Sequence, residues 1–184
     1  MLYVELKDFA ENFAEYVKQD YQFISYNNEA YALRGTVNDC NEEYCLKNNI
    51  KIIDIKHTGG TIVLSQTAVG YAIIHSSRSF KPEQVVCTTF VTFLRGKGLN
   101  AEYKDNDILI DGYKVGSAGS TYLPNGMVYT PIQFSLDNDA ELISKFCLKP
   151  MDKVPKGLSD FGITREDVLN FLENVVAMFD KLEL

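Results

Sequence analysis

Residues 106–118 read NDILIDGYKVGSA, a short stretch with the pattern of a β-hairpin. Two extended runs flank the pair Asp111-Gly112, and Asp-Gly between alternating strands is a strong signal for a two-residue hairpin loop. The second run carries Lys114, followed by the small residues of 116–118. Small residues leave the backbone accessible, and a neighbouring lysine supplies a cation for a phosphate or a developing oxyanion. The stretch therefore predicts a hairpin next to a candidate anion site, although a lone strand lysine is more often a solvated edge residue.

A second glycine-containing stretch, HTGGTIVLSQTAVGYAII, covers residues 57–74. The missing side chains of Gly59 and Gly60 would let a ligand approach backbone N–H groups, with His57 and Thr61 on either side. A turn or β-bulge explains paired glycines equally simply. The chain has no GxxxxGK[ST] motif, so neither stretch is a P-loop.

The rest of the chain supplies helices around a strand-rich centre. The expected strands are 22–26, 30–34, 51–57, 61–65, 69–77, 106–110, 113–122 and 127–136. The expected helices are 5–18, 41–49 (capped by Asn38 or Asp39), 82–98, 139–147 and 165–184 (capped by Thr164, with Asp167 in a capping box). This order predicts an α+β fold with a central mixed, mostly antiparallel sheet and packed helices.

Length and composition restrict the class of protein. A chain of 184 residues is long enough for one domain with a sizeable core, so 1–184 is expected to form a single domain. The net charge of −7 disfavours nucleic acid as a partner. Without an apolar run of about 18 residues or a signal-peptide pattern, no membrane association is expected. The four cysteines lack a CxxC spacing, and we expect no bound metal, reduced thiols and a cytoplasmic protein.

The order of the segments resembles the lipoate–protein ligase branch of the biotin/lipoate ligase superfamily along almost the whole chain. The segment 106–118, with Asn-Asp, a hairpin and a lysine before Gly-Ser-Ala, is the most diagnostic part of this resemblance. The other similar segments are NFAEYV (12–17), QFISYNNEAYALRGTVN (22–38), NEEYCLKNNIKIIDIKHTGGTIVL (41–64), GMVYTPIQFSLD (126–137) and LSDFGITREDVLNFL (158–172).

The resemblance implies a set of ligand-site residues. Lys114 would lie by the acyl carbonyl and the α-phosphate, where it would neutralise charge that develops in the reaction. Gly59 and Gly60, with the flanking His57 and Thr61, would allow close approach of the acyl chain and phosphate. The remaining implied contacts are Asn106 and Asp107 near the nucleotide, Gly116, Ser117 and Ala118 around its pocket, Asn38 on the ligand, and Arg34 on a phosphate.

The activity implied is ATP-dependent adenylation of lipoate or octanoate, followed by transfer to a lysine of a lipoyl domain, with Mg²⁺ accompanying ATP. The lysines that could form a basic rim for this acceptor are Lys97, Lys104, Lys114, Lys149, Lys153 and Lys156. Lys56-His57 and Leu64-Ser65 depart from the family pattern in the ligand loops. A catalytically silent relative that binds a small molecule or a protein therefore stays open. A cysteine-dependent octanoyltransferase is disfavoured, because residues 99–113 contain no cysteine.

Overall fold

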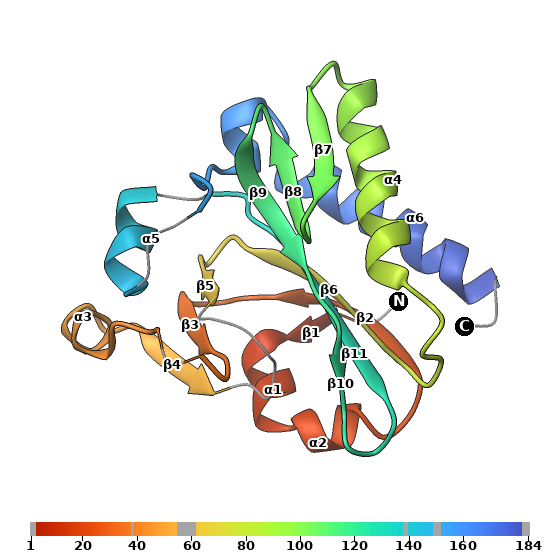
Figure 1. Cartoon of the computed structure of the whole chain (residues 1–184), viewed down its shortest axis with the longest axis horizontal. Helices are drawn as coiled ribbons and strands as arrows, with labels where there is room; N and C mark the ends of the chain where they lie inside the picture. Colours follow the sequence, from red (N-terminus) through yellow and green to blue (C-terminus); the bar gives the residue numbers. More distant parts are fainter. Residues whose placement is uncertain (1–2, 38, 55–61, 138–139, 149–151, 182–184) are drawn as a thin grey trace.

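The computed structural model describes residues 3–37, 39–54, 62–137, 140–148 and 152–181 (Figure 1). The strands are β1 (Tyr3–Glu5), β2 (Tyr21–Tyr26), β3 (Tyr31–Arg34), β4 (Lys51–Asp54), β5 (Ile62–Leu64), β6 (Val69–His75), β7 (Ala101–Lys104), β8 (Asp107–Ile110), β9 (Tyr113–Ala118), β10 (Thr121–Tyr122) and β11 (Val128–Phe134). The helices are α1 (Leu6–Glu11), α2 (Phe13–Tyr16), α3 (Glu42–Lys47), α4 (Pro82–Gly96), α5 (Ala140–Phe146), the 3₁₀-helix η1 (Leu158–Phe161) and α6 (Arg165–Lys181).

Two sheets form the framework. The larger, eight-stranded sheet has the order β1-β2-β6-β11-β9-β8-β7, with β10 paired to β11 outside this path. Its pairs are antiparallel except for β1 with β2. The smaller sheet has the order β4-β3-β5, with β3 parallel to β4 and antiparallel to β5. The predicted α+β fold with a mixed, mostly antiparallel sheet is therefore confirmed.

Each face of the large sheet packs against a different layer. The helices α4 and α6 cover one face, where Ile24, Ile73 and Ile132 join Phe90 and Phe171 in the largest apolar cluster (Figure 1). On the other face, α1 and the small sheet pack over a second apolar cluster. The central sheet is thus buried on both sides, which explains why all seven residues of β6 are buried.

The two long helices begin and end at the signals that the sequence carries. Pro82 occupies the first turn of α4, and Gly98, two residues beyond its last turn, has a φ of +84°. Before α6, the Thr164 N–H donates to Asp167 Oδ2 (2.9 Å) and the Asp167 N–H donates to Thr164 Oγ1 (3.1 Å). This reciprocal pair is the expected capping box.

Several local predictions were wrong. The helix expected over 5–18 is divided at Asn12, whose side chain donates to Asp8 Oδ1 (2.9 Å). Asn41, and not the expected Asp39, caps α3 by accepting from the Tyr44 N–H at 3.1 Å, while Asn38 lies outside the described residues. The short strands β1 and β7 were not expected, because each owes its extended backbone to a partner strand.

The described helices include none that is both long and apolar enough to cross a membrane. All four cysteines are free thiols, and Cys40, Cys45 and Cys87 are buried. Burial raises the pKa of the Cys45 and Cys87 thiols to about 12, so both are protonated at neutral pH.

Candidate ligand-binding cavity

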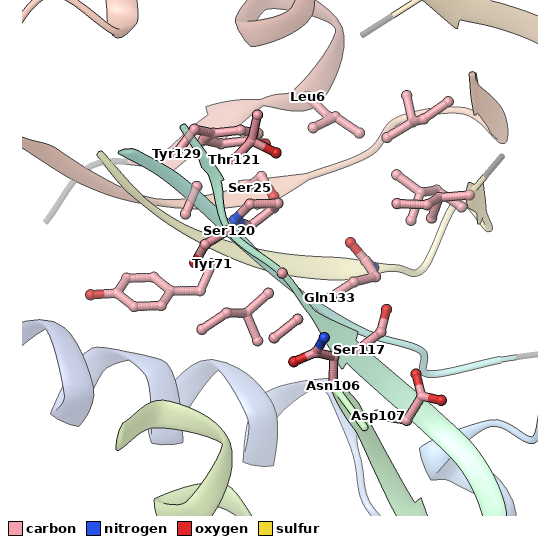
Figure 2. Close-up of a pocket in the computed structure, with 18 of the residues that line it drawn as sticks. Leu6, Ser25, Tyr71, Asn106, Asp107, Ser117, Ser120, Thr121, Tyr129 and Gln133 are labelled. Carbon is pink, nitrogen blue, oxygen red and sulfur yellow. The ribbon is translucent and has the colours of Figure 1, made fainter. Parts of the chain in front are cut away.

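A cavity of about 430 Å³ lies on the face of the large sheet that is turned toward α1 and the small sheet. Its apolar wall comes from α1, the large sheet and the small sheet, and it includes Leu6, Phe23, Leu33, Ile62, Leu64 and Ala72. Figure 2 shows Leu6 and Tyr129 on one side of the cavity and Asn106 and Asp107 on the opposite side. The cavity is therefore apolar around Leu6 and polar around Asn106 and Asp107, and Thr121 lies beside Tyr129.

The polar end continues a row of residues that crosses five strands of the sheet. Ser25 pairs with Gly70, Gly70 with Gln133, Gln133 with Ser117, and Ser117 with Asp107. Directly opposed residues on neighbouring strands point to the same face, so these side chains share the cavity face. Two residues along the strands, Phe23, Ala72 and Pro131 form the next row on this face. Strand register thus places a row of apolar residues beside a row of polar residues on the cavity face of the sheet.

A β-bulge brings Lys114 to the cavity face. Ile108 pairs with Gly116 while Leu109 pairs with Lys114, so Val115 is an extra residue in β9. In a regular strand, Lys114 and Ser117 would point to opposite faces because side chains alternate. The extra residue reverses this alternation, so both side chains line the cavity while Val115 is buried against α4 and α6.

The Lys114 ammonium is held at the cavity by an acidic partner. Its Nζ lies 2.7 Å from Asp107 Oδ1, and Lys153 Nζ lies 2.9 Å from Asp107 Oδ2. The Asp107 side chain is 15% exposed, which is well below the 39% of Lys114. One carboxylate therefore pairs with two ammonium groups at the polar end, and the formal charge of this trio is positive.

Asn106 and Asp107 reach this position through a tight turn. Asp105 and Asn106 both have positive φ (+53° and +67°) and connect Lys104 to its partner Asp107, which is the geometry of a two-residue type I′ hairpin. The Asn106 carbonyl then accepts from the Ala118 N–H at 2.9 Å. This bond ties the turn to the end of β9, so the Asn-Asp pair and the small residues after Lys114 meet at one edge of the cavity.

The sequence-based site residues are therefore only partly brought together. Asn106, Asp107, Lys114, Ser117 and Ala118 line the cavity. Gly116 does not, because it belongs to the opposite face, where a Cβ would stand 2.6 Å from the Gln133 carbonyl oxygen. Asn38, His57, Gly59, Gly60 and Thr61 lie outside the described residues. The next described residue after the glycines, Ile62, lines the cavity.

Arg34 has a different environment from the one expected. Its Nε lies 2.6 Å from Asp54 Oδ1, and its guanidinium also pairs with Glu42. Arg34 is not among the described residues that line the cavity. Its proposed contact with phosphate stays a prediction, and it would require the guanidinium to leave two carboxylates.

Several cavity residues carried no signal in the sequence. Ser25 and Gln133 are ordinary polar positions in apolar strands, and only the register across β2, β6 and β11 places them beside Ser117. Phe23 and Ala72 likewise read as core residues. Lys153 was expected only as part of a basic rim. An alternating strand pattern shows that one face is polar but does not show which strands are neighbours.

Metal ligands were not expected from the sequence. Among the described residues, no three His, Cys, Asp or Glu side chains gather as a metal-binding set. Mg²⁺ commonly binds through substrate phosphates, waters and one or two carboxylates. Asp107 is the carboxylate among the described lining residues, and both of its oxygens contact ammonium groups, so a magnesium ion that arrives with a nucleotide would bind Asp107 only by displacing one of them.

The fold and the cavity together define a class: an α+β domain that offers an apolar cavity ending at a lysine and an Asn-Asp turn. Residues 11–177 match the family model of the lipoyl protein ligase A/B catalytic domain. The chain belongs to this family. A search of curated proteins by sequence gives no significant match.

Solved structures agree with this fold. A T. acidophilum protein with bound lipoic acid has a TM-score of 0.76 and 17% identity, over 94% of this chain and 82% of that chain. A lipoate-protein ligase A bound with ATP has a TM-score of 0.75 and 17% identity, over 94% and 80%. A bi-partite lipoate protein ligase from Thermoplasma acidophilum, described with its E2 lipoyl domain, has a TM-score of 0.73 and 16% identity, over 93% and 79%.

Proposed function

We propose that this protein is a lipoate (or octanoate) protein ligase that adenylates its acid with ATP and transfers the acyl group to a lysine of a lipoyl domain. The observation that carries the proposal is the graded cavity, in which the apolar row of Phe23 and Ala72 leads to the polar row and Lys114. A medium-chain acid has the same gradient, with an apolar tail and one carboxylate. Family membership supports the same reading.

The acid would bind with its tail against the apolar wall and its carboxylate toward Lys114. In the first step, a carboxylate oxygen attacks the α-phosphorus of ATP, an acyl-adenylate forms, and pyrophosphate leaves. Negative charge accumulates on the α-phosphate oxygens during this step, and the Lys114 ammonium would neutralise it. Mg²⁺ bound with ATP would supply further charge neutralisation at the phosphates.

In the second step, the amine of the acceptor lysine attacks the acyl carbonyl and an amide forms as AMP leaves. Lys114 would again stabilise the developing oxyanion and the departing phosphate. The acceptor is proposed to be a lipoyl domain, since one similar structure is described together with such a domain. A cytoplasmic setting would supply ATP and keep the four thiols reduced.

Exchange of labelled pyrophosphate into ATP tests the first step directly. We expect exchange that depends on lipoate or octanoate, with biotin as the comparison acid. Folded protein that shows no exchange with any of the three acids would contradict the proposal. Binding of an acid without exchange would instead favour the silent relative, in which Asp107 stays paired with both lysines.

A further inference from the structure

A second lysine, Lys153, lies beside the polar end of the cavity, where it contacts the lining residue Asp107. The two Asp107 oxygens contact separate ammonium groups, Lys114 at 2.7 Å and Lys153 at 2.9 Å. Both ammonium groups therefore lie within the span of a single carboxylate. An anion of the size of a phosphate could bridge the same two groups, because phosphate oxygens accept from lysine in the same way.

Backbone hydrogen bonds fix Lys153 in this place. The Lys114 N–H donates to the Val154 carbonyl, and the Lys156 N–H donates to the Lys114 carbonyl, both at 3.0 Å. Farther along, Gly157 packs so closely on Leu136 that a Cβ would stand 2.2 Å from its carbonyl oxygen. The backbone after Lys153 is thus bound to β9 at the level of Lys114. Only 25% of the Lys153 side chain is exposed, so it differs from an ordinary surface lysine.

We propose that Lys153 is a second phosphate-binding residue, which contacts the β- and γ-phosphates of ATP while Lys114 serves the α-phosphate and the acyl carbonyl. This role rests on the proposed function, since it presumes that ATP binds in this cavity. Asp107 holds the two like charges together in the free protein, and the triphosphate takes over part of that contact. The hydrogen bond from Lys153 to Asp107 raises the pKa of Lys153, which keeps the ammonium charged at neutral pH.

A structural ion pair that only tethers the 152–156 segment is the competing explanation. The two explanations predict different effects when the charge of Lys153 is removed. A tether affects the free energy of unfolding, whereas a phosphate contact affects affinity for ATP and its dependence on salt. Each lysine of the pair would also have its own kinetic signature. Lys153 would chiefly set KM for ATP, and Lys114 would chiefly set kcat.

Calorimetric titration with Mg·ATP, together with pyrophosphate-exchange kinetics, separates these explanations. We expect Lys153→Gln to weaken ATP binding about 10- to 100-fold, as befits a lost charge-assisted hydrogen bond, and Lys153→Arg to restore most of the affinity. The salt dependence of binding should also become weaker in Lys153→Gln. The control is Lys51→Gln, which removes an ammonium from the similarly short Lys51–Glu29 pair (2.7 Å) at the small sheet.

The outcomes are distinct. Unmodified protein that binds ATP while Lys153→Gln binds it equally well would overturn the role of Lys153 and leave the ligase proposal standing. Unmodified protein that does not bind ATP would overturn both. A third outcome would assign Lys153 to the tether. In that case, Lys153→Gln binds ATP more weakly and has a lower free energy of unfolding, and Lys153→Arg does not restore the affinity.

Titration with metal-free tripolyphosphate adds an independent measurement. If Asp107 competes with the phosphates for the two ammonium groups, Asp107→Asn should bind tripolyphosphate several-fold more tightly than unmodified protein does. Weaker binding by this variant would contradict the idea that the phosphates replace Asp107 as the partner of the two lysines.

Discussion

Asp107 Oδ1 lies 2.7 Å from Lys114 Nζ, across two strands whose pairing is shifted by one residue. The shift, caused by the extra Val115, is what turns Lys114 toward the carboxylate and the cavity. The two residues come from the two arms of a single hairpin, so the site is built largely by local chain geometry. Four predictions follow from the structure, and they concern Lys114, Gly116, Ala72 and Asp167.

Lys114→Gln should abolish pyrophosphate exchange without unfolding the protein. We expect exchange to fall by about 10²- to 10³-fold, because a preorganised charge at the reacting phosphate is lost. The free energy of unfolding should change by less than about 1 kcal/mol, since Asp107 keeps its ion pair with Lys153 in this variant. Exchange assays and urea denaturation measure the two effects, with the exposed Lys104→Gln as the control. Undiminished exchange would remove the role assigned to Lys114.

Gly116→Ala should destabilise the protein, and Gly119→Ala should not. A Cβ at Gly116 would stand 2.6 Å from the Gln133 carbonyl oxygen and 3.2 Å from Ile108 Cδ1, whereas nothing lies within 4 Å of one at Gly119. Overpacking against a fixed backbone atom costs about 1–3 kcal/mol. Urea unfolding of the two variants provides the comparison. If Gly116→Ala and Gly119→Ala were equally stable, the backbone of β9 and β11 would have to move apart at a small energetic cost.

Ala72→Leu should block the acyl acid and leave the nucleotide unaffected. Ala72 lies in the apolar row between Phe23 and Pro131, away from Lys114, so a longer side chain fills the apolar floor. We expect affinity for octanoate to fall about tenfold or more, because a tightly packed wall cannot absorb the added volume. Calorimetry with octanoate and with Mg·ATP measures both ligands. Ile73→Val, on the opposite sheet face, is the control, and unchanged octanoate affinity in Ala72→Leu would place the acid elsewhere.

The contribution of Asp167 to stability should disappear in acid. The Lys97 ammonium, together with the N–H and hydroxyl of Thr164, lowers the pKa of Asp167 to about 2. A carboxyl with a lowered pKa stabilises the folded state above its unfolded value of about 3.9, and this stabilisation is lost as the pH falls toward 2. Asp167→Asn should therefore cost about 1–2 kcal/mol at pH 7.

Urea unfolding between pH 7 and pH 3 measures this difference. The gap between unmodified protein and Asp167→Asn should narrow as the pH falls below about 4. A gap that stays constant over this range would mean that Asp167 acts through packing or neutral hydrogen bonds.

The sequence was sufficient for the features that depend on neighbouring residues. The Asp111-Gly112 turn has the positive φ values that its residues favour, and Thr164 with Asp167 begins α6 as expected. Amphipathic periodicity located α4 and α6 within a few residues. Hydrogen bonds and side-chain preferences within one turn fix such features, so the local sequence contains the necessary information.

Tertiary structure decided everything that depends on which strands are neighbours. Ser25 and Gln133 became cavity residues through the register of β2, β6 and β11, and the same register turns Gly116 toward the opposite side of the sheet. The approach of Lys153 to Asp107 likewise requires partners distant in sequence. The sequence by itself determined most of the elements, the fold class and the lysine hairpin. Only the folded sheet decided which face carries Lys114, because side-chain direction reverses with each residue of register and long-range pairing sets that register.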